Sequence, residues 1–229
     1  MTHIYAAIFD MDGVLVDTYH AHFQSWLMMA KRAGLSFTEA EFAPTFGRTS
    51  REIIAHFWGQ GRFNDPQIAA LDEEKEAAFR DIIGKDFPAM PGVHELLTDL
   101  FIADWRLAVG SSGPPENVEL ILDRLGKGDL FSAIVTGMDV TRGKPDPQVF
   151  LLAAKRLGVP PSRCVVIEDA QPGVAAAQAA GMAAVGLVST GRTRKELAAA
   201  DLVVDSLADI SPRALGELID RSRKRSNLT

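Results

Sequence analysis

Two acidic residues in the stretch IFDMDGVLVDT, residues 8–18, could do chemistry. Asp10 and Asp12 follow an apolar run and precede Gly13. If the run forms a strand that continues through them, their side chains share one face and repel each other. Burying such a pair is costly or forces one carboxyl to keep its proton. The pair therefore either belongs to an ordinary Asp-Gly surface turn or is compensated by another group.

Polar residues also follow other apolar runs of the chain. Ser111 and Ser112 end one run, and Glu168 and Asp169 end another. Lys144 lies in the sequence RGKPDP, between a third run and the helix expected after it. In a doubly wound parallel sheet, ligands bind at the carboxyl ends of the strands. We therefore expect these residues to meet Asp10 at one site.

The charges of this predicted site do not balance. Asp10, Asp12, Glu168 and Asp169 are acidic, whereas Lys144 supplies a single positive charge. Carboxylate oxygens without a histidine or cysteine set favour Mg²⁺, which also binds substrate phosphates. A magnesium ion would keep Asp10 ionised and screen an incoming phosphate from the acidic groups. A purely structural role for the acids would leave their charge uncompensated.

The elements that must position these residues alternate along the chain. Helical patterns separate short apolar runs that are typical of strands buried on both faces. This alternation predicts the α/β class, with a doubly wound parallel sheet. The expected strands are residues 4–10, 106–112, 133–137, 164–169 and 183–189, and the expected helices are 114–126, 146–158, 172–182 and 194–200.

The segment 18–87 interrupts this alternation. It lacks clear strand patterns and is rich in helix formers, as in DEEKEAAFRDII, residues 72–83. Prolines 88 and 91 mark the return to the α/β pattern. We therefore expect a catalytic core of residues 1–17 and 88–229, with residues 18–87 inserted as a helical domain.

Composition excludes several classes of function. The chain of 229 residues is 47% hydrophobic, has a net charge of −6 and contains a single cysteine, Cys164, in an apolar run. The negative charge argues against nucleic-acid binding, and no apolar run approaches the roughly 20 residues of a membrane helix. We expect a cytoplasmic protein, a monomer or weak dimer, with Cys164 buried and inert. The basic end, residues 221–229, is expected to be a frayed, solvated tail.

The motifs together resemble the haloacid dehalogenase superfamily, in its phosphatase and phosphomutase branch. The matching features are DMDGVLVDT at 10–18, Ser111, Lys144 within KPDP, and EDAQPGV at 168–174, in the order that this superfamily shows. The helical insertion after the first motif is similar to the cap of β-phosphoglucomutase-like members. The resemblance implies a Rossmann-like core with an inserted α-helical cap.

The resemblance also implies roles for the acidic residues. Asp10 would attack phosphorus and form an aspartyl-phosphate, which divides one difficult displacement into two steps. Asp12 would protonate the leaving oxygen and then deprotonate the attacking water or hydroxyl group. Around Mg²⁺ it implies Asp10, Asp169 and the backbone carbonyl of Asp12, with Glu168 orienting a metal-bound water.

Phosphate binding is implied for three further residues. Ser111 and Lys144, together with the adjacent Ser112, would hold the phosphoryl oxygens where negative charge is spread in the transition state.

Five residues of the insertion are candidates for contacting the substrate. His22 and Trp26 are four apart on one predicted helix face, although both could simply pack in a core. Arg48 and Arg51, in FGRTSRE, could grip phosphate or sugar oxygens or be solvated. Lys75 lies in a charged stretch, where a surface salt bridge is the usual role. Spacing matches His22, Trp26 and Lys75 to cap residues of β-phosphoglucomutase-like proteins.

The predicted activity is a Mg²⁺-dependent phosphatase that acts on a small phosphorylated metabolite, with a sugar phosphate favoured. A hexose-phosphate mutase is the alternative. A phosphoacceptor signalling domain would also use an aspartate, Mg²⁺, a hydroxyl and a lysine, but it lacks the insertion and the second acid of the first motif. A dehalogenase does not need Asp12.

Overall fold

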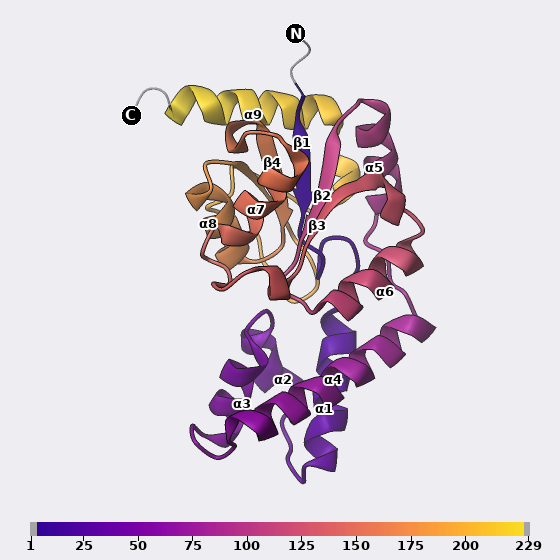
Figure 1. The fold of residues 1–229 in the computed structure, drawn as a ribbon, viewed down its shortest axis with the longest axis vertical. Coiled ribbons are helices and arrows are strands. Elements are labelled where there is room, and N and C mark those ends of the chain that lie inside the picture. The colour runs from indigo at the N-terminus through magenta and orange to yellow at the C-terminus, as the bar shows by residue number, and fades with distance from the viewer. Residues whose placement is uncertain (1–3, 227–229) are drawn as a thin grey trace. The chain divides into compact units, whose positions relative to one another are not determined.

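The computed structural model describes residues 4–226, and these residues form two compact units. The first unit runs to Asp17 and resumes at Ala89, and the second spans Thr18–Pro88. The ribbon in Figure 1 follows the chain by colour from indigo at the N-terminus to yellow at the C-terminus. We describe each unit separately.

The first unit is built on a six-stranded sheet in which all neighbouring strands are parallel. The spatial order is β3-β2-β1-β4-β5-β6, so the first strand of the chain lies in the middle. This confirms the predicted doubly wound parallel sheet. The strands are β1 (Ala6–Phe9), β2 (Arg106–Gly110), β3 (Phe131–Val135), β4 (Cys164–Glu168), β5 (Ala183–Leu187) and β6 (Leu202–Val204).

Helices cover both faces of the sheet. Figure 1 shows α7 and α8 on one side of the strands and α5 on the other. Ile8 of β1 and Phe150 of α7 are both completely buried in the core on this side of the sheet. The helices of this unit are α5 (Val93–Ile102), α6 (Pro115–Leu125), α7 (Gln148–Leu157), α8 (Gln171–Ala179) and α9 (Pro212–Ser226), and short 3-10 helices lie at Gly128–Leu130, Gly137–Asp139, Pro161–Arg163 and Leu207–Asp209.

Burial explains why the strands were visible as apolar runs. Every residue of β1, β4 and β5 is buried, as expected of parallel strands covered on both faces. The edge strand β3 instead alternates between buried and exposed positions. Cys164, at the start of β4, is fully buried, and burial raises the pKa of its thiol to about 12, which confirms the expected inert cysteine.

The structure corrects two expectations for the C-terminal part of the chain. Residues 194–200 form turns instead of a helix, beginning where the Thr193 side chain accepts a hydrogen bond from the Glu196 amide. A segment this short has few helical hydrogen bonds to stabilise it. The basic end is helical as far as Ser226, because α9 packs its apolar side on the sheet unit, with Leu215 and Leu218 buried. Residues 227–229 of the predicted tail lie outside the described residues.

The second unit is helical throughout. Its aromatic core includes Phe23, Trp26 and Phe42, and α1 packs along α4. Side-chain capping boxes start α2, α3 and α4, which explains their well-defined first turns. The helices are α1 (Tyr19–Arg32), α2 (Glu39–Phe42), α3 (Ser50–Trp58) and α4 (Asp65–Lys85), with a 3-10 helix at Ala43–Thr45.

Within residues 4–226, no helix has both the length and the apolar character that crossing a membrane requires.

Candidate active site

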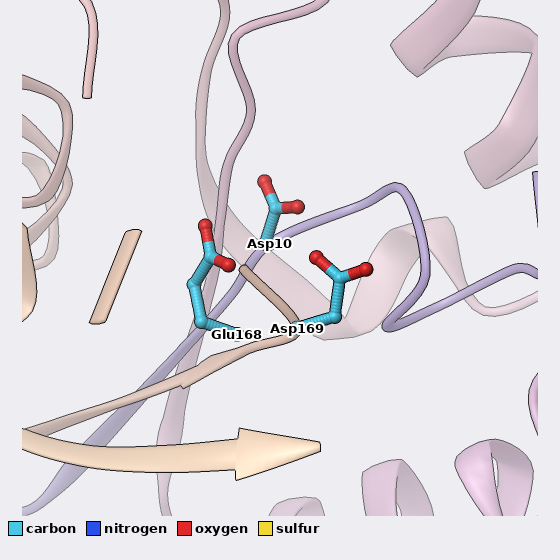
Figure 2. A group of neighbouring side chains, drawn as sticks. All are labelled: Asp10, Glu168 and Asp169. Atoms are coloured by element: carbon cyan, nitrogen blue, oxygen red, sulfur yellow. The ribbon is translucent and has the colours of Figure 1, made fainter. Parts of the chain in front are cut away.

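Three carboxylates meet at the carboxyl ends of the two central strands. Asp10 directly follows β1, Glu168 is the last residue of β4, and Asp169 comes next. The parallel register pairs β1 with β4, and the Asp10 amide donates to the Ile167 carbonyl at 3.0 Å. One oxygen from each of the three side chains lies within 4.8 Å of the others. Figure 2 shows the three carboxylates on the same side of the strand ends.

Lys144 joins two of these carboxylates. Its ammonium group donates to Asp10 Oδ1 at 2.6 Å and to Glu168 Oε1 at 2.8 Å. The lysine side chain is only 10% exposed. The other oxygen of Glu168 accepts the Ala170 amide at 2.7 Å. The predicted convergence of Lys144 with the strand ends is thus present in the structure.

Two glycines make room for the acidic side chains. A Cβ at Gly173, in α8, would lie 1.7 Å from Glu168 Oε1, so any side chain there would displace this carboxylate. A Cβ at Gly13 would lie 2.2 Å from Asp169 Oδ2, and Gly13 also has a φ of +74°. Both glycines are therefore required by the close approach of a carboxylate.

The carboxylates are under-compensated in the protein alone. Burial, opposed by the charge of Lys144, raises the pKa of Asp10 well above its usual range. Burial and the neighbouring Glu168 raise the pKa of Asp169 to about 7. Although burial lowers the pKa of Lys144, the Asp10 and Glu168 carboxylates outweigh this and raise it. The site therefore favours an additional cation near Asp10 and Asp169.

The donor set fits a hard divalent cation. The group contains three buried carboxylates and, among the described residues, no histidine or cysteine. Carboxylate oxygens of this kind bind Mg²⁺, Ca²⁺ or Mn²⁺. The structure thus supports a metal-binding role for the acidic cluster.

Asp12 lies in a tight turn beside this cluster. The Met11 carbonyl accepts the Leu15 amide at 2.9 Å, and the Gly13 amide donates to the Val16 carbonyl at 2.8 Å. The Asp12 side chain is half-buried and is not part of the three-carboxylate group. Its charge still contributes to the raised pKa values of Asp10 and Asp169. The Asp-Gly turn exists, but it belongs to a largely buried site.

The two predicted phosphate-binding serines differ in exposure. Ser111 is fully buried directly after β2, where its amide donates to the Val135 carbonyl at 2.9 Å. Its hydroxyl oxygen accepts the Gly113 amide at 3.0 Å. Ser112 is exposed. Their contact with phosphate remains a prediction.

The sequence reasoning missed two residues that contact the acidic cluster. Ser189 donates from its hydroxyl to Asp169 Oδ2 at 2.8 Å, and Arg192 Nε lies 3.5 Å from the same oxygen. Both follow β5. The rule that located the other residues, polar groups after an apolar strand, would have found Ser189 had it been applied to the run 183–189, but not Arg192, which lies three residues beyond that run.

A family model described as haloacid dehalogenase-like hydrolase matches residues 4–181. The chain belongs to this family. This confirms the resemblance that the four motifs indicated. The chain is therefore a member of an enzyme family, and its three carboxylates lie at the strand ends where the motifs predicted them.

This hydrolase resembles both phosphatases and a phosphomutase. It is 34% identical over 229 residues to "Beta-phosphoglucomutase" of Bacillus subtilis (strain 168), covering 97% of this chain and 99% of the relative. It is 33% identical over 207 residues to "Validoxylamine A 7'-phosphate phosphatase" of Streptomyces hygroscopicus subsp. limoneus, covering 89% and 94%. The crystal structure of a β-phosphoglucomutase from Clostridium difficile has a TM-score of 0.86 at 28% identity, covering 97% and 100%.

In the helical unit of this hydrolase, Lys75 is buried, contrary to the surface position that its charged neighbours suggested. It is 3% exposed and contacts His22 Nδ1 at 2.8 Å and Glu76 Oε1 at 2.7 Å. The ammonium group also lies 5.8 Å from the Trp26 ring centroid and 5.4 Å from that of Phe79. Three of the predicted substrate residues thus form one cluster within this unit, in which Lys75 and Trp26 are buried and His22 is half-buried.

The two predicted arginines lie elsewhere on the helical unit. Arg51 makes an exposed ion pair with Asp65 at 3.0 Å. Arg48 is exposed and, with Glu52, His56 and other residues near α3, lines an open depression of about 370 Å³. The substrate roles of both arginines stay predictions.

Proposed function

We propose that this hydrolase is a Mg²⁺-dependent phosphatase of a small phosphorylated metabolite, with a sugar phosphate as the favoured class. The observation that carries the proposal is the environment of Asp10. This carboxylate is buried, bonded to Lys144, and grouped with Glu168 and Asp169. Burying such a group of acids is costly unless a cation compensates their charge, and acids in an environment of this kind are typical of functional sites.

We assign the metal site to Asp10, Glu168 and Asp169, with the backbone carbonyl of Asp12 as an additional ligand. The hard oxygen donors of this group and the raised pKa values of Asp10 and Asp169 support Mg²⁺. When bound, Mg²⁺ supplies positive charge that lowers the repulsion between an incoming phosphate and the carboxylates.

The proposed reaction begins with attack of an Asp10 carboxylate oxygen on phosphorus. The new bond makes an aspartyl-phosphate while the bond from phosphorus to the ester oxygen breaks. Asp12 gives its proton to the departing alkoxide, and then takes a proton from the water that hydrolyses the aspartyl-phosphate. Lys144, Ser111 and Ser112 are assigned to the phosphoryl oxygens, where they would stabilise transition-state charge.

The sugar-phosphate preference is supported by the names of the relatives. One is named a validoxylamine A 7'-phosphate phosphatase, and another is named a β-phosphoglucomutase. We assign substrate selection to the helical unit, where five residues predicted from the sequence would contact the substrate. These residues are His22, Trp26, Arg48, Arg51 and Lys75.

A hexose-phosphate mutase is the second candidate. It is favoured by the β-phosphoglucomutase relative, because the alignment spans nearly all of both chains. Both activities use the same aspartyl-phosphate, and they differ in whether water or a sugar hydroxyl accepts the phosphoryl group. Formation of glucose 6-phosphate from β-glucose 1-phosphate without released phosphate would identify the mutase.

A panel of phosphorylated sugars, polyols and nucleotides, assayed for released phosphate with and without Mg²⁺, tests the function. Asp10→Asn should lower turnover by about 10⁴-fold or more, since the nucleophile is lost. Its melting temperature should stay the same or rise, because one of several repelling acids is neutralised. Asp129→Asn is the matched control on an exposed position and should keep full activity. Undiminished turnover in Asp10→Asn would disprove the assignment.

A further inference from the structure

The turn that follows β5 contacts two residues of the first unit. One is Asp169, a carboxylate of the proposed metal site, and the other is Asp17, the last residue before the helical unit. The Ser189 hydroxyl donates to Asp169 Oδ2, and Arg192 Nε lies 3.5 Å from the same oxygen. Between them, the Thr190 hydroxyl donates to Asp17 Oδ2. No function has been assigned to this turn in the proposed reaction.

We propose that Ser189 is a positioning residue that fixes the Asp169 carboxylate for the metal ion, with Arg192 as a second support. This inference rests on the proposed Mg²⁺ site. Neither residue is assigned a contact with substrate or with the reacting atoms. Their effect is exerted through Asp169.

The fit around Asp169 supports this role. Ser189 and Asp169 are both buried, so their hydrogen bond competes little with water. Gly13 closes the other side of the contact: a Cβ there would lie 2.2 Å from Asp169 Oδ2 and 3.0 Å from Ser189 Oγ. One carboxylate oxygen is therefore enclosed by the Ser189 hydroxyl and the Gly13 backbone. This fixes the rotation of the carboxylate and with it the direction of the second oxygen, Oδ1.

A fixed carboxylate binds a metal better than a mobile one. Ordering a ligand in advance removes part of the entropy cost of binding. Partners of this kind around metal ligands typically change metal affinity by about 10- to 100-fold when they are removed. Arg192 lies farther from Oδ2, at 3.5 Å, so we assign it the smaller part.

Calorimetric titration of the metal-free full chain with Mg²⁺ tests the proposal without measuring activity. Ser189→Ala should weaken Mg²⁺ binding by about 10-fold. Ser189→Thr keeps a hydroxyl and should bind within about 2-fold of the unchanged protein. Ser132→Ala is the matched control, because this serine is exposed on the edge strand β3, which β2 separates from β1.

The outcomes separate this inference from the proposed function. If the unchanged protein fails to bind Mg²⁺, the proposed function is overturned. If it binds Mg²⁺ and Ser189→Ala binds equally well, only the positioning role is overturned. A Ser189→Thr protein as weak as Ser189→Ala would also overturn it, since packing would then matter and not the hydroxyl. Should Ser189→Ala not fold, Ser189→Cys, with a similar volume and a weak donor, is expected to show the same 10-fold loss.

Discussion

Among the described residues, 4–226, charge is buried in two places, and it is compensated differently in each. At the strand ends of the first unit, several acids gather around the single ammonium group of Lys144, with Arg192 at the margin. In the helical unit, a single cation, Lys75, is enclosed by an imidazole, the Glu76 carboxylate and aromatic rings.

The difference shows which buried charge is prepared for a ligand. The Lys75 cluster supplies an anion and two ring faces within its own unit, so its cation is already accommodated. The strand-end cluster retains raised carboxylate pKa values despite Lys144, so it stays short of positive charge. Both clusters contain buried charged groups, so burial alone does not indicate which of them binds a ligand. The balance of charge does, because only the strand-end cluster is short of positive charge.

Removing Lys144 should have the largest effect on stability. Lys144→Met in the metal-free protein leaves Asp10 and Glu168 without their shared cation. We expect the free energy of unfolding at pH 8, measured with urea, to fall by about 3 kcal/mol. At pH 5 the loss should be smaller, because burial raises the pKa of Asp10 and a lower pH therefore favours its uncharged form.

Lys155→Met is the control for this substitution, because Lys155 is exposed on α7. It should change the free energy of unfolding by less than about 0.5 kcal/mol. A Lys144→Met protein that is equally destabilised at both pH values would show that packing, and not charge, is lost.

The pH dependence of the metal-free protein should be the next largest effect. The pKa of Asp169 is raised from 3.8 to about 7, so the folded protein binds a proton more tightly than the unfolded chain between these values. Stability therefore falls as the pH rises from about 4 to about 7 and stays reduced above it. The raised pKa of Lys144 contributes no change in this window, because its ordinary value is 10.5. Melting temperatures should drop by several degrees between pH 5 and pH 8.

Saturating Mg²⁺ should remove most of this drop, since the ion binds the ionised carboxylates and displaces the proton. Asp169→Asn without metal should show a weaker pH dependence than the unchanged protein. An equal dependence in both would mean that other groups cause it.

Replacing Lys75 should have the smallest effect. Lys75→Met substitutes an unbranched apolar side chain that packs well against the rings of Trp26 and Phe79. Only one carboxylate, that of Glu76, loses this partner, and its side chain keeps 13% of its surface in solvent, so the free energy of unfolding should fall by about 1 kcal/mol, less than for Lys144→Met. Urea unfolding of this variant, alongside Lys144→Met and Lys155→Met, measures the change in the free energy of unfolding. A loss as large as that of Lys144→Met would show that the ammonium charge itself is required.

Most of the core site could be predicted from the sequence because its acids stand at strand ends. The carboxyl ends of parallel strands lie along one edge of the sheet, so Asp10, Glu168 and Asp169 meet once β1 and β4 are neighbours. Lys144 reaches them from the loop after β3, which motif order indicated but strand ends did not. The sheet could also be predicted, apart from β6, which has three residues and only one buried position.

Other features depend on contacts that the local sequence does not encode. Lys75 sits among acidic neighbours typical of a surface helix, and its burial follows from the way α4 packs against α1. Arg192, three residues beyond the apolar run 183–189, reaches Asp169 because of the path of the turn after β5. The alanine-rich residues 194–200 favour a helix by composition, but they form turns, with Leu197 buried among the residues packed on the sheet.

The central place of β1 has a consequence for how the chain is made. Its two neighbours in the sheet, β2 and β4, are synthesised only after the whole helical unit. A growing chain therefore carries a fully apolar first strand that has no partner until residues 106–110 emerge, and no second partner until 164–168. At about 5–20 residues per second, this wait lasts seconds. The helical unit can fold during that time, whereas Asp10 meets Glu168 only when most of the protein has left the ribosome.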